Sequence, residues 1–303
     1  MDEKLTISVQ ISGYGGKEAL TRILNGILMQ KTEKKLEINL VDNGTVAELE
    51  ALLNDIITKE DISYNIITDP LSYFAVENAT GKYVAFCCYN DFWSDENKLE
   101  KQIEILEKNP EYSSCVHDIN LLNKNKLPYR HAVQQRYKKQ RFTASKVYTY
   151  IQLQENILPA PISTLICRNI FQDDMVKKWI TSETKNPKQR LYTAVVLSGS
   201  CYNLANEMMA SRIALKPYRS ALSACNYETA LNEIKELDAI CQFASEYSNK
   251  KFDKSYRLIR IASLNFEVYK KSGKSSEELQ HFIELYDLAY DVRYDAPTEE
   301  CHE

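Results

Sequence analysis

The chain has 303 residues, of which 44% are hydrophobic and 26% are charged, and its formal net charge at pH 7 is −4. This length is enough for one large α/β domain with a helical appendage, or for two small domains. The acidic balance gives no general case for nucleic-acid binding, and no stretch approaches the roughly 18 apolar residues that a membrane-spanning helix needs. Eight cysteines without a C-x-x-C spacing predict reduced thiols. We therefore expect a cytoplasmic protein without a signal peptide, with peripheral attachment to the inner face of the membrane as the alternative.

Strand and helix patterns alternate over the first 67 residues. Residues 5–11 (LTISVQI), 36–41 and 62–67 are typical of strands, and each of the two segments between them has apolar residues at helical spacing. This alternation predicts parallel strands that are joined by right-handed crossovers.

Residues 79–102 (ATGKYVAFCCYNDFWSDENKLEKQ) carry the central pattern of the chain. The apolar run at 83–88 is short and bounded by polar residues, which predicts a strand buried on both faces. The polar residues Asn90 and Asp91 follow it, and Ser94 or Asp95 is expected to cap a helix whose apolar face includes Leu99. Open α/β sheets bind their ligands at such carboxyl ends of strands.

The same residues resemble the inverting family 2 glycosyltransferases. An A-x-G-K-Y turn, an apolar strand, an acidic tip, an aromatic–Trp pair and K-L-E-K-Q match the frame of that family. The resemblance implies an α/β, GT-A-like (Rossmann-like) fold in which helices flank a mainly parallel central sheet. In the family, carboxylates at the strand tip hold a divalent cation against the donor diphosphate. Here the tip reads C-Y-N-D at 88–91, so the resemblance leaves Asn90 and Asp91 to bind Mg²⁺ or Mn²⁺, and weak metal binding is expected.

The opening of the chain resembles the same family, whose first strand usually reads V-S-V-I-I-P-T-Y-N. The resemblance implies that Ser12, Tyr14 and Asp42 bind the base and ribose of a nucleotide-sugar. Chemically, Asp42 can accept from a base N–H or a ribose hydroxyl, and Tyr14 can stack on a base. The alternative is that residues 42–44 (D-N-G) form only a turn. Residues 68–80 contain no Arg to meet a diphosphate.

Two features follow in the middle of the chain. Residues 112–122 predict another strand, in which we expect His117 to be structural rather than an acid–base catalyst. The basic stretch 124–146 interleaves Lys and Arg with aromatic residues. It either attracts a phosphorylated acceptor, a nucleotide, a protein partner or an anionic membrane surface, or forms a solvated loop.

The resemblance assigns no catalytic base. The family places an acidic residue at the head of a helix near the acceptor, and the matching window 186–191 reads N-P-K-Q-R-L. The nearest carboxylates are Glu183 and Glu207. The family's Tyr-Arg-x-His element corresponds to S-R-I-A at 211–214, so Arg212 is kept and the His is not.

From residue 227 onward the pattern is helical, so we expect a GT-A-like glycosyltransferase domain at 1–215 and a C-terminal helical region at 216–303. Two functions fit. One is transfer of a sugar from a nucleotide-sugar donor to a glycan, lipid-linked or protein acceptor, with Asp91 as the main metal or diphosphate contact. The other is a catalytically inactive relative, a pseudoenzyme that acts as a partner subunit or binding module in glycan assembly. The absent base and the reduced set of carboxylates favour the second.

Overall fold

The computed structural model describes residues 6–12, 16–41, 45–68, 74–88, 91–123, 125–128, 146–151, 161–182, 187–205, 209–213 and 227–250, with the single residues 253, 280 and 284. The chain divides into two compact units, Met1–Tyr150 with Ile157–Lys216, and Ile151–Asn156 with Pro217–Glu303. The second unit contains helix α8 (Tyr227–Ser248). The predicted boundary at 215/216 lies outside the described residues and stays a prediction, as do the helices expected beyond residue 253.

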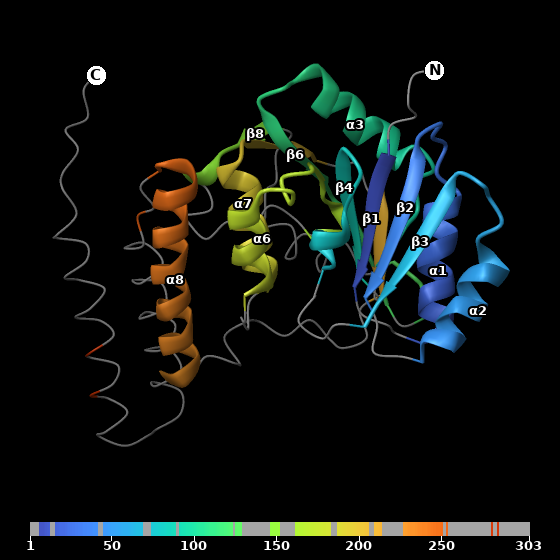
Figure 1. The fold of residues 1–303 in the computed structure, drawn as a ribbon, viewed down its shortest axis with the longest axis horizontal. Helices are drawn as coiled ribbons and strands as arrows, with labels where there is room; N and C mark the ends of the chain where they lie inside the picture. Colours follow the sequence, from blue (N-terminus) through green and yellow to red (C-terminus); the bar gives the residue numbers. More distant parts are fainter. Residues whose placement is uncertain are drawn as a thin grey trace. The chain divides into compact units, whose positions relative to one another are not determined.

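The first unit is built around a mixed, mainly parallel sheet (Figure 1). Its order within the described part of the chain is β3-β2-β1-β4-β9-β6-β10-β8. The strands are β1 (Thr6–Ser12), β2 (Lys35–Val41), β3 (Ile62–Ile67), β4 (Tyr83–Cys88), β6 (Tyr112–His117), β8 (Lys146–Tyr148), β9 (Ile166–Arg168) and β10 (Ser200–Leu204). Strands β1, β2, β3 and β4 pair in parallel, whereas β9 runs antiparallel between β4 and β6. The predicted parallel pairing of the N-terminal strands is therefore confirmed.

The helices of the first unit pack on this sheet and on one another. They are α1 (Lys17–Leu28), α2 (Val46–Ile56), α3 (Lys98–Lys108), α6 (Asp174–Thr181) and α7 (Pro187–Leu197), with short 3₁₀ turns η1 (Val76–Asn78) and η2 (Ile162–Thr164). Figure 1 shows α1 and α2 close together beside β1, β2 and β3. The buried face of α1 carries Leu20, Ile23 and Ile27 at helical spacing, and it joins the core with Ile7 and Val9 of β1. None of the described helices is both long enough and apolar enough to cross a lipid bilayer.

A second, smaller sheet has the order β5-β11-β7, with β5 (Asp91–Trp93), β7 (Ile119–Leu122) and β11 (Ala210–Ile213). It corrects the single strand predicted at 112–122, because the chain leaves the large sheet after His117 and continues in β7, which pairs with β11. His117 is fully buried, and its Nδ1 lies 2.6 Å from the carbonyl oxygen of Asp118. These contacts agree with a structural role for His117.

Strand β4 is buried along its whole length, as predicted from its apolar run. The predicted cap of the following helix is wrong, because α3 begins at Lys98 and Asn97 is its N-cap. Asp95 instead accepts from the backbone N–H of Asn97 at 2.7 Å and from Lys101 Nζ at 2.9 Å. The carboxylate therefore organises the turn before the helix rather than its first residue.

Helix α1 lies directly against the backbone of β5. A Cβ atom at Gly26 would come within 2.7 Å of the Trp93 carbonyl oxygen, so only glycine fits there without a shift. This close approach holds β5, which follows the polar end of β4, against the core of the large sheet.

Candidate functional site

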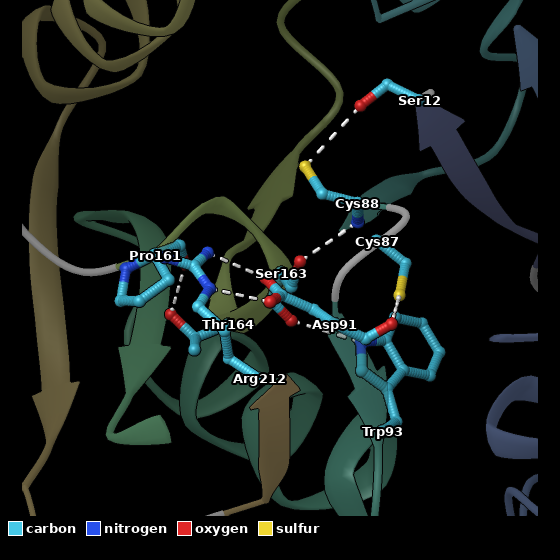
Figure 2. A network of polar contacts seen from close by, with 9 residues as sticks. All are labelled: Ser12, Cys87, Cys88, Asp91, Trp93, Pro161, Ser163, Thr164 and Arg212. Atoms are coloured by element: carbon cyan, nitrogen blue, oxygen red, sulfur yellow. Dashed lines mark hydrogen bonds and ion pairs between the residues drawn. The ribbon is translucent and has the colours of Figure 1, made fainter. Parts of the chain in front are cut away.

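The carboxyl ends of three parallel strands meet in one row. Ser12, the last residue of β1, is in register with Val41 of β2 and with Cys88 of β4. Ser12 Oγ lies 3.4 Å from Cys88 Sγ, which joins two of these ends (Figure 2). Tyr14, Asp42 and Asn90 follow the three strands but lie outside the described residues, so their places in a site stay predictions.

We call Cys88 and Asp91, the described residues on either side of 89–90, the β4 tip. Ser163 of η2 bonds to residues on both sides of 89–90. The Ser163 Oγ accepts from the Cys88 backbone N–H at 3.0 Å, and the Ser163 carbonyl oxygen accepts from the Trp93 indole N–H at 3.0 Å (Figure 2). Cys87 Sγ also donates to the Asp91 carbonyl oxygen at 3.7 Å. These bonds fix the backbone on which Asp91 is carried.

A buried lysine completes the support below the tip. The side chain of Lys98 is inaccessible to solvent, and its Nζ lies 4.3 Å from the centroid of a Trp93 ring. It donates to Gln102 Oε1 at 2.8 Å, and Gln102 Nε2 in turn donates to the carbonyl oxygens of Cys115 and Thr164 at 2.9 Å each. Burial lowers the pKa of Lys98 to about 7, although the ring face favours the ammonium form. The Trp and K-L-E-K-Q positions are therefore a scaffold for the tip.

The side chain of Asp91 forms a two-point ion pair with Arg212. Arg212 Nε donates to Oδ1 at 2.6 Å and Nη2 donates to Oδ2 at 2.8 Å. The two residues are direct partners in the antiparallel β5–β11 ladder. The Asp91 side chain is 0% exposed, whereas that of Arg212 remains 28% exposed. The sequence identified each residue but did not predict the pair.

The described donor atoms do not fit a divalent cation. Both carboxylate oxygens of Asp91 bind the guanidinium of Arg212. Burial raises the pKa of the Cys88 thiol and the Asp91 carboxylate raises it further, so at neutral pH this thiol is protonated and is a poor metal ligand. No group of three or more His, Cys, Asp or Glu residues able to hold a metal occurs within the described ranges, which exclude Asn90.

Positive charge reaches the tip from two elements. Lys188, an exposed residue in the first turn of α7, and Arg212 of β11 both lower the pKa of Cys88, which opposes the effect of burial. Arg190 of α7 has a different role: its guanidinium lies 4.2 Å from the Trp179 ring centroid and donates to the Trp179 carbonyl oxygen at 3.1 Å. In the sequence, Lys188 counted only as part of a window without an acidic residue. The positive charge of Lys188 was the available signal of a cation that acts on Cys88.

Residues 187–191 of α7 contain no carboxylate, so this part of the helix offers no general base. Glu183 and Glu207 lie outside the described residues, and most of the basic stretch 124–146 does as well. Lys126 is described, and its Nζ lies 3.4 Å from Glu18 Oε1. No catalytic residue is assigned from these contacts.

Residues 8–168 match the family model described as Glycosyl transferase family 2. Uncharacterized proteins of Mycobacterium tuberculosis (Rv1520) and Mycobacterium bovis (Mb1547) are each 27% identical to this chain over 128 residues. The match covers 38% of this chain and only 36% of the length of each relative.

The fold is similar to that of TarS of S. aureus. The crystal structure of TarS 1-349 in complex with UDP-GlcNAc has a TM-score of 0.56 and 15% sequence identity, covering 96% of this chain and 81% of that one. A second crystal structure of TarS 1-349 has a TM-score of 0.52 and 13% identity, covering 96% and 91%. At this identity the likeness shows the fold, which is GT-A-like as expected from the sequence.

Proposed function

The chain belongs to glycosyl transferase family 2, and on this premise we propose that it binds a nucleotide-sugar and transfers the sugar to a glycan, lipid-linked or protein acceptor. The supporting observation is the row formed by the ends of β1, β2 and β4, with Ser12 in contact with Cys88. Open α/β sheets bind ligands at this edge. The neighbouring fold of TarS was solved with UDP-GlcNAc, so uridine diphosphate sugars are the first donors to test.

The proposed donor site comprises five residues at this edge. Ser12, Tyr14 and Asp42 would bind the base and ribose, and Asn90 and Asp91 would face the diphosphate. Retention of Mg²⁺ or Mn²⁺ by Asn90 and Asp91 stays a separate proposal, and it requires Asp91 to exchange Arg212 for the ion. In that case the ion would stabilise the negative charge of the leaving diphosphate.

An inactive relative that only binds the nucleotide-sugar is the second candidate. The observation that favours it is the charge pairing at the site: Arg212 engages the carboxylate of Asp91, and residues 187–191 supply no base. Such a protein would act as a binding module or partner subunit in glycan assembly. The basic stretch 124–146 is its proposed contact with an acceptor, a protein partner or a membrane surface.

Calorimetry with UDP-GlcNAc and other nucleotide-sugars, combined with an assay for released nucleoside diphosphate, separates the candidates. Binding with turnover supports the transferase, and binding without turnover over a broad acceptor set supports the binding module. Asp42→Ala should weaken binding by about 1.5–3 kcal/mol, the contribution of a hydrogen bond to a charged group. Asp55→Ala on the exposed surface of α2 is the matched control. Absence of binding by every nucleotide-sugar would contradict both candidates.

A further inference from the structure

Strand β3 is the outermost strand of the large sheet beside β2 (Figure 1). Within the described part of the chain it pairs only with β2, so the backbone groups on its other edge have no strand partner there. Its sequence is I-S-Y-N-I-I, with no charged residue and no proline, and its register with β2 has no bulge. Charges, proline, bulges and short length normally keep an edge strand from pairing with another chain. Strand β3, with six residues, has none of these protections.

The strand at the opposite edge of the sheet is different. Among the described strands this is β8, which has only three residues and begins with the exposed Lys146. A short strand offers few backbone groups to a second chain, and a lysine on the edge disfavours pairing. The contrast indicates that β3 is the edge of the sheet that is able to accept a further strand.

A row of carboxamide side chains crosses three strands and ends at the β3 edge. Gln10, Asn39 and Asn65 are direct partners in the parallel register of β1, β2 and β3. Asn65 Nδ2 donates to Asn39 Oδ1 at 2.9 Å, and Asn39 Nδ2 donates to Gln10 Oε1 at 3.1 Å. The row begins at Phe74 and Ala75, whose carbonyl oxygens accept from Gln10 Nε2 at 3.1 and 3.2 Å. Gln10 and Asn39 are buried, whereas Asn65 is exposed.

The Asn65 amide has bonding capacity left at the exposed end of this row. Among the described residues, one of its N–H groups is bonded to Asn39, and its Oδ1 accepts from none of them. A carboxamide has two N–H donors and an oxygen that accepts, so a second carboxamide placed opposite forms two reciprocal hydrogen bonds with it. Asn65 of a second copy provides this group when the two β3 strands run antiparallel about a twofold axis at this residue. The row of amides then continues from one chain into the other.

The same register brings like faces of the two strands together. With Asn65 on the axis, Tyr64 lies opposite Ile66 of the second copy, and pairs of an aromatic and a β-branched residue stabilise neighbouring strands. Both residues belong to the side of β3 that packs against the core, so core-side residues meet core-side residues. A shift by one residue would place the core side of one strand beside the solvent side of the other. The edge is therefore complementary to itself in this register.

We propose that β3 is a self-association surface, on which β3 of a second copy of this chain pairs in antiparallel orientation with Asn65 on the twofold axis. The two large sheets then form one continuous sheet. A second copy fits because the edge is uncharged, matches itself face to face, and ends in an amide that another Asn65 satisfies. One strand on each side makes a small interface, so the dimer should be weak, with a Kd on the order of 50 µM.

Sedimentation velocity on the full chain at increasing concentration tests the association. We expect the dimeric fraction to rise from below about 10% at about 2 µM to more than about half at about 200 µM. Asn65→Lys places two like charges opposite each other and should raise the Kd at least about tenfold. Asn25→Lys, at an exposed position of α1, is the matched control and should behave as the wild type. Circular dichroism verifies the fold of each variant, and Ser63→Lys, which keeps the bond between Asn65 and Asn39, is a second edge variant with the same expected direction.

Cysteine cross-linking tests the register. Residues that lie directly opposite in an antiparallel pair are close enough for a disulfide, so Asn65→Cys should form a covalent dimer on mild oxidation. Ser63→Cys is the matched control, because its two copies would lie about four residues apart along the strands, beyond the reach of a disulfide. The wild type, oxidised in the same way, accounts for the native cysteines.

Three results would overturn the proposal. A wild type that stays monomeric at about 200 µM removes the second copy as the occupant of this edge. Dimerisation of folded Asn65→Lys and Ser63→Lys as strong as that of Asn25→Lys places the contact elsewhere on the chain. Cross-linking of Ser63→Cys as efficient as that of Asn65→Cys contradicts the register. None of these results bears on the proposed nucleotide-sugar site.

Discussion

The scaffold below the β4 tip and the tip itself use polar side chains in different ways. In the scaffold, Lys98, Gln102 and Ser163 are fully buried. Lys98 donates to the side chain of Gln102, Gln102 donates to backbone carbonyl oxygens, and the Ser163 carbonyl oxygen accepts from the Trp93 indole. At the tip, the completely buried Asp91 pairs with Arg212, which stays partly exposed. The first arrangement stabilises a backbone, and the second leaves charge accessible to a ligand.

This difference teaches that family membership and site chemistry are carried by different residues. Trp93, Lys98 and Gln102 match the family frame because they hold the end of β4 and η2 together. Cys88 occupies one of the carboxylate positions of the family motif, and its contact with η2 is made by its backbone N–H, which a change of side chain leaves in place. Breaking the scaffold should therefore reduce stability more than breaking the Asp91–Arg212 pair does, whereas only changes at the tip should also alter ligand binding.

Trp93→Ala should have the largest effect, a loss of about 3–5 kcal/mol in the free energy of unfolding, because it removes a buried ring from the core. Urea unfolding followed by circular dichroism measures this loss. Trp93→Phe keeps a ring but loses the indole N–H bond to Ser163, so it should cost less. A loss below about 1 kcal/mol in Trp93→Ala would show that the scaffold does not depend on the ring.

Arg212→Gln should lower the free energy of unfolding by about 1–3 kcal/mol, because it leaves the buried Asp91 carboxylate without its cation. The expected loss is below that of a fully buried pair, since the Arg212 side chain is partly exposed to solvent. The double variant Asp91→Asn/Arg212→Gln removes the unpaired charge and should recover most of the loss in the same unfolding experiment. A double variant no more stable than Arg212→Gln would be inconsistent with this ion pair.

Lys98 should make stability depend on pH. Its pKa falls from an ordinary 10.5 to about 7 in the folded chain, so between these values the unfolded chain binds a proton that the folded chain lacks. The free energy of unfolding should therefore rise with pH through this window, by about 2 kcal/mol between pH 7 and pH 9. Lys98→Met should abolish that rise in urea titrations, whereas Lys178→Met should retain it. A wild-type stability that falls from pH 7 to pH 9 while that of Lys98→Met stays level would argue against the depressed pKa.

Ser163→Ala should have the smallest effect, about 1 kcal/mol, since it removes one neutral hydrogen bond to the Cys88 backbone N–H. Hydrogen exchange at the Cys88 amide should become faster. Ser198→Ala, which removes a hydroxyl bonded to the Ala194 carbonyl oxygen at the end of α7, is the control and should leave that amide unchanged. Slow exchange at Cys88 in Ser163→Ala would mean that η2 does not hold this side of the tip.

The sequence predicted the N-terminal half of the fold closely because hydrophobic periodicity reports local burial. Strands β3 and β4 have the predicted bounds, and β1 and β2 match to within one residue. The division of residues 112–122 was missed, since a single residue, Asp118, separates β6 from β7 and no Gly or Pro marks it. A buried Asp was not recognisable as the point where the chain changes sheets.

The candidate site was predicted in outline only. A ligand site was expected at the carboxyl end of β4, and the register of the sheet places the ends of β1 and β2 in the same row. The Asp91–Arg212 pair joins residues 121 positions apart through an antiparallel register, which local patterns do not encode. The burial of Lys98 was not predicted either, because a lysine in a charged helix usually lies on the solvent-exposed face.

The most direct test of the Asp91–Arg212 pairing is the affinity of Asp91→Asn for UDP in EDTA and in Mn²⁺, compared with that of the wild type by calorimetry. Where GDP is the diphosphate that the wild type binds, the same comparison is made with GDP. If Arg212 occupies Asp91, no metal ion links this carboxylate to the diphosphate, so Asp91→Asn should keep the affinity within about twofold of the wild type in both conditions. If Asp91 binds a metal ion that holds the diphosphate, the wild type should bind appreciably only in Mn²⁺, and the variant should lose about tenfold or more of that affinity. A loss of that size would contradict the account.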